Sequence, residues 1–173
     1  MYVDILILSS VVARPSYGYE IKRGVGRSLG GAIAINNNQL YPALQRFEEM
    51  GAIEKEVVRQ EGRPDRHVYR ATELAREILG EMLRDFPPEL ARNDAEFQVR
   101  VALLDRLDPE DRRRILKTRK EFLQELLKFY DEMVPRAQDS GHPYAEKVVA
   151  FQRSAAEHEL AWISSLEREV AGA

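Results

Sequence analysis

Only one stretch of this 173-residue sequence has the pattern of β-strands, and helical patterns surround it. Two short extended segments, 53–59 and 67–71, flank a polar turn that contains Gly62 and Pro64. Glycine and proline between two such segments are typical of a β-hairpin. Elsewhere the apolar residues recur at helical spacing. The predicted fold is therefore mainly α with a small β-hairpin.

Two helices are predicted at the start of the chain. The first covers Val3–Ala13 and is strongly apolar, which indicates a buried helix. We expect Ser16 to cap a second helix that runs to Ser28, because a serine hydroxyl accepts hydrogen bonds from first-turn amides. Gly30 and Gly31 then end this helix.

Two more helices flank the hairpin. One runs from the asparagine stretch 36–38 to about Met50, and Gly51 follows it as a residue suited to the left-handed conformation. Thr72 is expected to cap the other. The apolar positions of that helix are Leu74, Ile78, Leu79, Met82 and Leu83.

The chain divides at Phe86-Pro87-Pro88, because two prolines do not fit inside a continuing helix. Residues 1–86 have the element order of a winged helix-turn-helix, and residues 91–173 have helical patterns throughout. The prediction is thus a winged helix-turn-helix domain followed by an all-α antiparallel helical domain.

Composition limits the function. The net charge is −3, yet residues 20–46 carry four basic groups against one acid, and residues 59–70 carry four arginines against two acids. A nucleic-acid-binding surface needs such local excess, not a basic protein. No cysteine is present, no catalytic motif is found, and the apolar first segment is too short to span a membrane. We expect a cytoplasmic protein without cofactor or metal that is not an enzyme.

Several motifs sharpen the prediction. Gly18-Tyr19-Glu20-Ile21-Lys22 resembles the GYEIK signature of the PadR family of transcriptional regulators. The run 39–48, QLYPALQRFE, resembles the recognition helix of that family, and the run 66–73, RHVYRATE, resembles the end of its wing. These motifs lie in family order over the first half of the chain. Asn38 and Ala75 stand where the family often has glycine, which leaves base preference open at the start of the recognition helix.

The resemblance implies binding to double-stranded DNA, with the third helix in the major groove and the wing at the backbone or minor groove. The residues assigned to this contact are Tyr19, Lys22, Asn37, Asn38, Gln39, Tyr41, Gln45 and Arg46 around the recognition helix, and Gly62, Arg63 and Arg66 in the wing. Alternatives stay open: the asparagines cap the helix, Tyr19 and Tyr41 pack against the protein, and the wing is simply solvated.

The second half contains two long helices. Asp108 caps the first, which is predicted to end at Met133 before Pro135. The last helix carries a stripe of residues spaced three and four apart, which favours a partner helix. The residues of this stripe assigned to the interface are Tyr144, Val148, Phe151, His158, Trp162 and Leu166. The alternative partner is the preceding helix of the same chain.

Because relatives dimerise through their C-terminal helices, the resemblance implies a homodimer on a pseudo-palindromic operator. It also implies a repressor modulated by a small aromatic or hydrophobic effector, bound near the aromatic residues of the last two helices. Aromatic residues at this spacing also occur simply as core. The alternative function is a winged-helix protein-interaction module without DNA binding.

Overall fold

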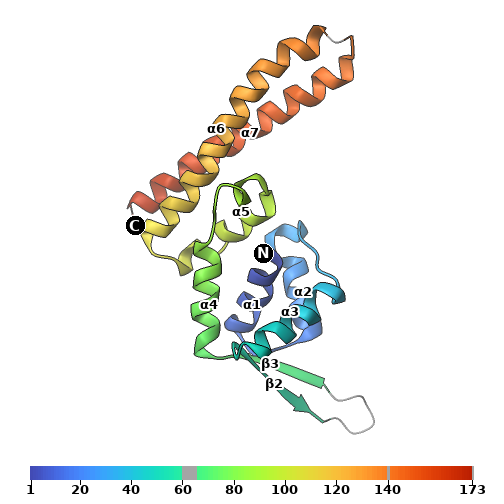
Figure 1. Ribbon diagram of the computed structural model, residues 1–173, viewed down its shortest axis with the longest axis vertical. Coiled ribbons are helices and arrows are strands. Elements are labelled where there is room, and N and C mark those ends of the chain that lie inside the picture. The colour runs from blue at the N-terminus through green and yellow to red at the C-terminus, as the bar shows by residue number, and fades with distance from the viewer. Residues whose placement is uncertain (60–65, 140, 173) are drawn as a thin grey trace. The chain divides into compact units, whose positions relative to one another are not determined.

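The computed structural model describes residues 1–59, 66–139 and 141–172. The chain forms two compact units (Figure 1). The winged-helix unit comprises Met1–Asp85 and Asp94–Leu107, and the helical unit comprises Phe86–Asn93 and Asp108–Ala173. The predicted fold class, mainly α with a small β element, is confirmed. The sequence predicts one boundary, at residues 86–91. In the structure the division is different, because residues 94–107 belong to the winged-helix unit.

Helix α1 (Tyr2–Ala13) lies at the centre of the winged-helix unit. Ile5, Ile7 and Leu8 have no exposed surface, although they point in different directions around the helix. Helices α2 (Gly18–Arg27), α3 (Asn37–Glu49), α4 (Glu73–Arg84) and α5 (Asp94–Val101) pack against α1, together with strand β3. Burial of an apolar helix on all sides explains why its sequence has no polar stripe.

A tight turn separates α2 from α3. It contains the 3₁₀ helix η1 (Ser28–Gly31), in which Leu29, Gly30 and Gly31 all have positive φ angles, of 51°, 65° and 81°. Two glycines meet this demand without steric cost, whereas Leu29 is strained. Ile33 and Ile35 then enter the core and set the start of α3.

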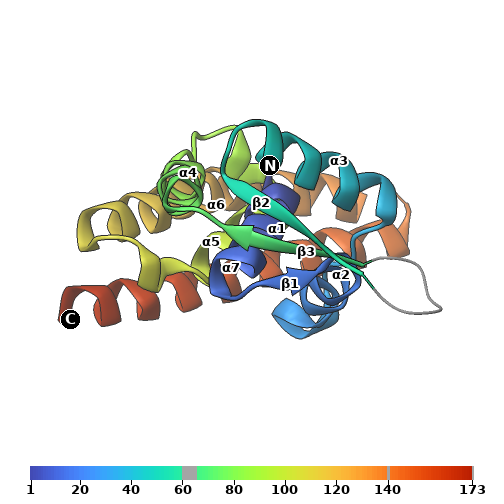
Figure 2. The same ribbon diagram turned by 90° about the horizontal axis from the view of Figure 1, so that it is seen from below.

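The sheet has three antiparallel strands, in the order β1-β3-β2. Strands β2 (Ile53–Val58) and β3 (Arg66–Ala71) form the predicted hairpin, and β1 (Ser16–Tyr17) pairs with the outer edge of β3 (Figure 2). The predicted capping role of Ser16 is therefore wrong. Ser16 is paired opposite Tyr69, and its hydroxyl donates to the carbonyl of Arg14 at 3.1 Å.

Two expectations for α4 also fail. Thr72 occupies the N-cap position, but its hydroxyl donates to the carbonyls of Gly51 and Ala52 at 2.9 and 3.0 Å and caps no amide. Leu74 is exposed, and Ala75 is buried in its place. Both differences follow from the hairpin, which ends directly before α4 and fixes the rotation of its first turn.

A buried cation joins α4 to α5. The Arg100 guanidinium has no exposed surface and donates to the carbonyls of Met82, Leu83 and Asp85 at 3.1, 3.2 and 2.8 Å. These carbonyls lie in the last turn of α4, which has no intrahelical donors left for them. Arg100 also pairs with the Glu96 carboxylate at 2.6 Å, and Glu96 accepts from the backbone N–H of Tyr2 at 2.9 Å. One charged pair therefore ties together α1, α4 and α5.

The helical unit is an antiparallel hairpin of α6 (Pro109–Asp139) and α7 (Pro143–Gly172), with the short 3₁₀ helix η2 (Leu90–Arg92) beside α6. Asp108 caps α6 as predicted, accepting from the N–H of Asp111 at 2.9 Å. Arg119 is buried and pairs with both carboxylate oxygens of Glu159 at 2.8 and 2.7 Å, so it fastens α6 to α7.

The predicted end of α6 before Pro135 is wrong, because the helix continues through this proline to Asp139. A proline inside a helix removes one hydrogen bond and disfavours the preceding turn. Here packing against α7 compensates, and beyond the proline Gln138 still donates to Glu146 of α7 at 3.4 Å.

We predict that Arg100→Met destabilises the winged-helix unit strongly. The substitution leaves the Glu96 carboxylate and three carbonyls of α4 buried without their donor, a loss of about 3–5 kcal/mol in the free energy of unfolding. Urea denaturation measures this loss. The control is Arg70→Met, which breaks an exposed pair with Glu56 and should cost under about 1 kcal/mol. Equal effects would contradict the role given to Arg100.

A second prediction concerns acid stability. Burial alone would raise the pKa of Glu96, but hydrogen bonds from Arg100 and the Tyr2 amide hold this pKa below its usual value of 4.5. A carboxylate with a depressed pKa contributes stability above its unfolded pKa and loses it as the pH falls through the folded pKa. Glu96→Gln should therefore lower stability at neutral pH and flatten the decline below about pH 4.5 in urea titrations. An unchanged acid profile would count against this.

Candidate nucleic-acid interface

Helix α3 has one face in the core and one in solvent. Leu40, Leu44 and Phe47 are buried, as predicted, while Asn37, Asn38, Gln39, Tyr41, Gln45 and Arg46 are all exposed. The helix begins with a reciprocal cap: the Gln39 N–H donates to Asn36 Oδ1 at 3.0 Å, and the Asn36 N–H donates to Gln39 Oε1 at 3.1 Å. The asparagine stretch thus supplies one cap, Asn36, and two further side chains in the exposed first turn.

Helices α2 and α3 are linked across the exposed surface. The Lys22 ammonium donates to Asn37 Oδ1 at 2.9 Å, so two predicted contact residues hold each other. Further along α3, Gln45 donates to Glu49 at 2.9 Å. Asn38 has no side-chain hydrogen bond among the described residues, and it is the predicted reader whose amide group stays open to a ligand.

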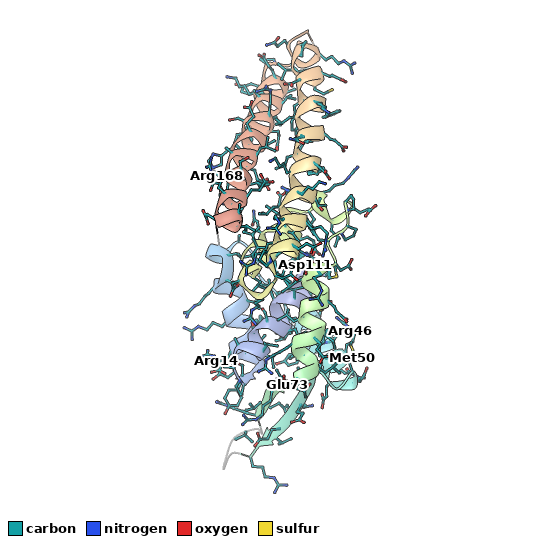
Figure 3. The ribbon with its side chains drawn as sticks, turned by 90° about the vertical axis from the view of Figure 1, so that its left-hand side faces the viewer. Arg14, Arg46, Met50, Glu73, Asp111 and Arg168 are labelled. Atoms are coloured by element: carbon teal, nitrogen blue, oxygen red, sulfur yellow. The ribbon has the colours of Figure 1, made fainter. Side chains whose placement is uncertain are left out.

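Arg46 lies on the outer side of α3 near Met50 (Figure 3). Its guanidinium pairs with Asp4 of α1 at 2.7 Å, and its side chain is 54% exposed. An exposed ion pair contributes at most about 1 kcal/mol. The pair therefore orients Arg46 along the surface and gives way at low cost to another anion.

A group of tyrosines lies where α2, α3 and the sheet meet. A pocket of about 230 Å³ is lined by Tyr17, Gly18, Tyr19, Tyr41, Arg66, His67 and Tyr69. Tyr17 and Tyr19 are stacked, with ring centroids 5.8 Å apart, and the Arg66 guanidinium lies 5.9 Å from each of these rings. Arg66 is thus held at the base of the wing by cation–π contacts.

Gly18 allows Tyr41 to reach this pocket. A Cβ atom at position 18 would lie 3.3 Å from a Tyr41 ring carbon, which is closer than most Cβ atoms pack. Tyr41 is nevertheless 49% exposed, so its ring both packs on α2 and faces solvent. Burial raises the pKa of the Tyr69 hydroxyl, and Tyr41 and Glu48 nearby add to this shift. The Tyr69 hydroxyl therefore stays protonated and able to donate.

Sequence reasoning missed part of this group. Tyr17, His67 and Tyr69 were not predicted at the site, because β1 has only two residues and gives no periodic signal. The pairing of Tyr17 with Val68 brings them together. Alternation along β3 was the available signal, since residues 67 and 69 share one face of a strand. Gly62 and Arg63, predicted at the wing tip, lie outside the described residues.

The predicted interface residues lie on α7, but mostly away from α6. Tyr144, Val148, Phe151 and Trp162 are 78%, 58%, 68% and 39% exposed, His158 is exposed, and Leu166 is partly buried. The face of α7 toward α6 instead buries Ala156 and Ile163. The intramolecular hairpin therefore forms, and it leaves Tyr144, Val148 and Phe151 more than half exposed.

A pocket of about 440 Å³ lies elsewhere in the helical unit. Its lining residues are Pro88, Glu89, Arg92, Thr118, Glu121, Phe122 and Glu125, and none of them belongs to the predicted effector residues.

Within the described ranges, no cluster of acidic or histidine side chains is arranged to hold a metal ion. Among the helices described, none is long and apolar enough to cross a bilayer.

Helices α1–α4 with the three-stranded sheet define a winged helix-turn-helix domain. Residues 7–81 match the transcriptional regulator PadR-like family. The match covers less than half of the chain and lies within this domain, which is therefore similar to the PadR-like family of transcriptional regulators.

Individual relatives were also found. A probable transcriptional regulator of Mycobacterium tuberculosis is 32% identical over 79 residues, which are 46% of this chain and 42% of that protein. The match thus spans less than half the length of this curated relative. A transcriptional regulator from Clostridium thermocellum is 30% identical, with 46% of this chain and 75% of that chain covered and a TM-score of 0.43. Bacillus subtilis PadR, solved with operator DNA, is 16% identical over 96% of each chain, with a TM-score of 0.46.

The cap of α3 leads to a prediction that separates capping from exposed positions. Asn36→Ala removes the acceptor for the Gln39 amide and should lower the free energy of unfolding by about 1 kcal/mol. Asn38→Ala is the matched control, because Asn38 is exposed in the same turn, and its effect should stay within about 0.5 kcal/mol. Urea denaturation of both variants provides the comparison. A larger loss for Asn38→Ala would show that the cap is assigned to the wrong asparagine.

Proposed function

We propose that this protein is a dimeric, sequence-specific DNA-binding regulator that acts as a repressor. The observation that carries the proposal is the exposed face of α3, which places amide side chains in its first turn beside a surface with Lys22, Arg46 and Arg66. A recognition helix reads base edges near its N-terminus, and neighbouring cations contact phosphates. The similarity of residues 7–81 to the PadR-like family supports regulation of transcription, and the arrangement of this face supports DNA as the ligand.

Within this proposal, Asn38 is the principal reader. Its amide presents one acceptor and two donors, and asparagine pairs bidentately with adenine in the major groove. Gln39 uses its carbonyl oxygen in the cap of α3 and retains its N–H₂ donors for a base. Asn37 and Gln45 can contact DNA only after they break their present hydrogen bonds, which join Asn37 to Lys22 and Gln45 to Glu49.

The phosphate contacts come from three elements in this proposal. Arg46 leaves Asp4 for a phosphate, Lys22 extends from α2, and Arg66 approaches the backbone from the base of the wing together with Tyr19 and Tyr41. Tyrosine hydroxyls donate to phosphate oxygens. The rings of Tyr17 and Tyr19, which both contact the Arg66 guanidinium, limit the movement of Arg66. Arg63 would extend the same contact.

A dimer completes the proposed reader. Four large apolar side chains on one face of α7 are exposed, and a second copy would cover them. The two-fold symmetry of such a dimer then matches the symmetry of a pseudo-palindromic operator.

Occupation of that operator would repress transcription. Deletion of the gene should therefore raise expression from the bound promoter, and a fall in expression would contradict repression. A small aromatic or hydrophobic effector at the aromatic face would modulate the dimer, and unchanged operator affinity across such ligands would count against this part.

The test of DNA binding is a salt titration. With DNA from the promoter of the protein's own gene, log affinity should fall steeply with log salt, because bound phosphates release counterions. Arg66→Ala should weaken binding to all sequences and reduce the slope by about one. Arg136→Ala removes the same charge from an exposed position on α6 and should change neither. If the protein does not bind this DNA even at low salt, the proposal is wrong, and the alternative of a protein-interaction module without DNA binding is favoured.

The same assay tests base readout. Asn38→Ala should lose about 1–3 kcal/mol of preference for the operator over a sequence changed at one base pair. Its affinity for unrelated DNA should stay nearly constant, since no phosphate contact is removed. If operator preference is intact in Asn38→Ala, the reading face of α3 has been placed wrongly.

A further inference from the structure

A second pocket of the winged-helix unit is formed by α1, α4 and the 3₁₀ helix η3 (Leu104–Arg106). It has a volume of about 190 Å³. Its lining residues are Val12, Arg76, Leu79, Gly80, Leu83 and Arg106. None of these residues is assigned to DNA or to the aromatic face of α7, so the proposed function does not account for this pocket.

The two charged residues of the lining are arginines from different elements. Arg106 of η3 is exposed, and its guanidinium has no hydrogen bond or ion pair with any described residue. Arg76 of α4 pairs with Glu73 at 2.5 Å, and both side chains are more than half exposed. Such exposed pairs are weak, so Arg76 can exchange Glu73 for another anion. The lining of this arginine pocket therefore offers two guanidinium groups and no carboxylate to a ligand.

Gly80 brings a third guanidinium group to the edge of the arginine pocket. A Cβ atom at position 80 would lie 3.2 Å from Nη1 and 3.6 Å from Nη2 of Arg84, so the Arg84 guanidinium lies directly over this glycine. Glycine in the middle of a helix is destabilising relative to alanine. At this position it lowers the stability of α4 and leaves room for a cation beside the pocket.

The rest of the lining is apolar. Leu79 and Leu83 are buried, and Val12 is partly buried. Electrostatic attraction is stronger beside such groups than in open water, because the local dielectric constant is lower. Guanidinium groups bind phosphate through paired hydrogen bonds, and a phosphate monoester carries up to two negative charges. Several cations around one pocket favour such a dianion over a singly charged anion.

We infer that the arginine pocket binds a small phosphate monoester. Arg76 and Arg106 donate to the phosphate oxygens, and Arg84 adds positive charge beside them. The carbon part of the ligand lies against Leu79 and Leu83. Sites for drug-sized ligands measure about 300–1,000 Å³. A pocket of about 190 Å³ therefore holds a phosphate group with a short carbon chain and is too small for a nucleotide.

Calorimetric titration of the whole 173-residue chain at pH 8 tests the class of ligand. Propyl phosphate should bind at least roughly ten-fold more tightly than the diester methyl propyl phosphate, because the diester loses one charge and one charge-assisted hydrogen bond. The diester also represents the DNA backbone, whose phosphates carry one charge each. Equal affinity for the two esters, or no binding of propyl phosphate, would overturn the inference.

Inorganic phosphate separates the ester from free phosphate. It should bind more weakly than propyl phosphate, by about four-fold for each methylene that the pocket buries. Equal affinity for the two compounds would identify free phosphate as the ligand and overturn the assignment to an ester.

Replacement of an arginine tests the location of the site. Arg106→Met should weaken binding of propyl phosphate by roughly ten-fold or more, because it removes a charge-assisted pair. Arg113→Met removes the same charge from an exposed position on α6 and should leave the affinity unchanged. Equal affinities of these two variants would overturn the inference. A loss of DNA binding in Arg106→Met would make the pocket part of the DNA contact and overturn it as well.

Gly80→Ala provides a measurement that a purely structural role would not explain. Alanine is the better helix former, so the urea midpoint should rise. Its Cβ atom forces the Arg84 guanidinium to move by a few tenths of an ångström. Binding of propyl phosphate should weaken by roughly two-fold or more, since guanidinium recognition depends on a fixed geometry. If this variant binds propyl phosphate as the wild type does, the part given to Arg84 is wrong.

Discussion

The winged-helix unit depends on the burial of α1. Five of its apolar side chains, Ile5, Leu6, Ile7, Leu8 and Val11, are buried, and the segments that follow pack around them. Helices α2 and α3 cover one part of it, α4 another, and α5 returns from later in the chain to close the remaining surface. The Arg100–Glu96 pair then holds α4 and α5 to the start of α1. The position of α3 is thus a consequence of how α1 is enclosed.

This arrangement gives α3 one buried face and one solvent-exposed face. The buried side chains of α3 fix it to the core, so its polar first turn can remain in solvent without loss of structure. The Asn36 side chain caps the helix, whereas the Asn38 side chain, two residues later, is exposed to solvent. Helix α7 is divided in a similar way: Ala156 and Ile163 are buried, whereas Tyr144, Val148 and Phe151 are exposed. In both helices, the side chains that stabilise the fold and those that remain exposed lie on different faces.

Sequence patterns were reliable where the interaction is local. The αL residue Gly51 (φ 72°) and the cap at Asp108 each depend on neighbours a few residues away, and both were predicted correctly. Predictions failed where a distant segment competed. Ser16 pairs with β3 and therefore does not cap α2. The Thr72 hydroxyl donates to the turn after α3 and therefore does not cap α4. The helix continues through Pro135 because α7 supports the part beyond it. The tyrosine pocket was only partly foreseen for the same reason, since its residues come from four separate elements.

The sequence by itself determined helices α1–α4, the existence of the two long helices, the hairpin and the polar face of α3, because periodicity and capping act within one or two turns of chain. Only the tertiary structure decided which face of each helix is covered, that Arg100 and Arg119 are buried with carboxylate partners, and that Arg66 is held by two tyrosines. Those outcomes depend on contacts between residues far apart in the chain, whose free energy is defined only once the elements have packed.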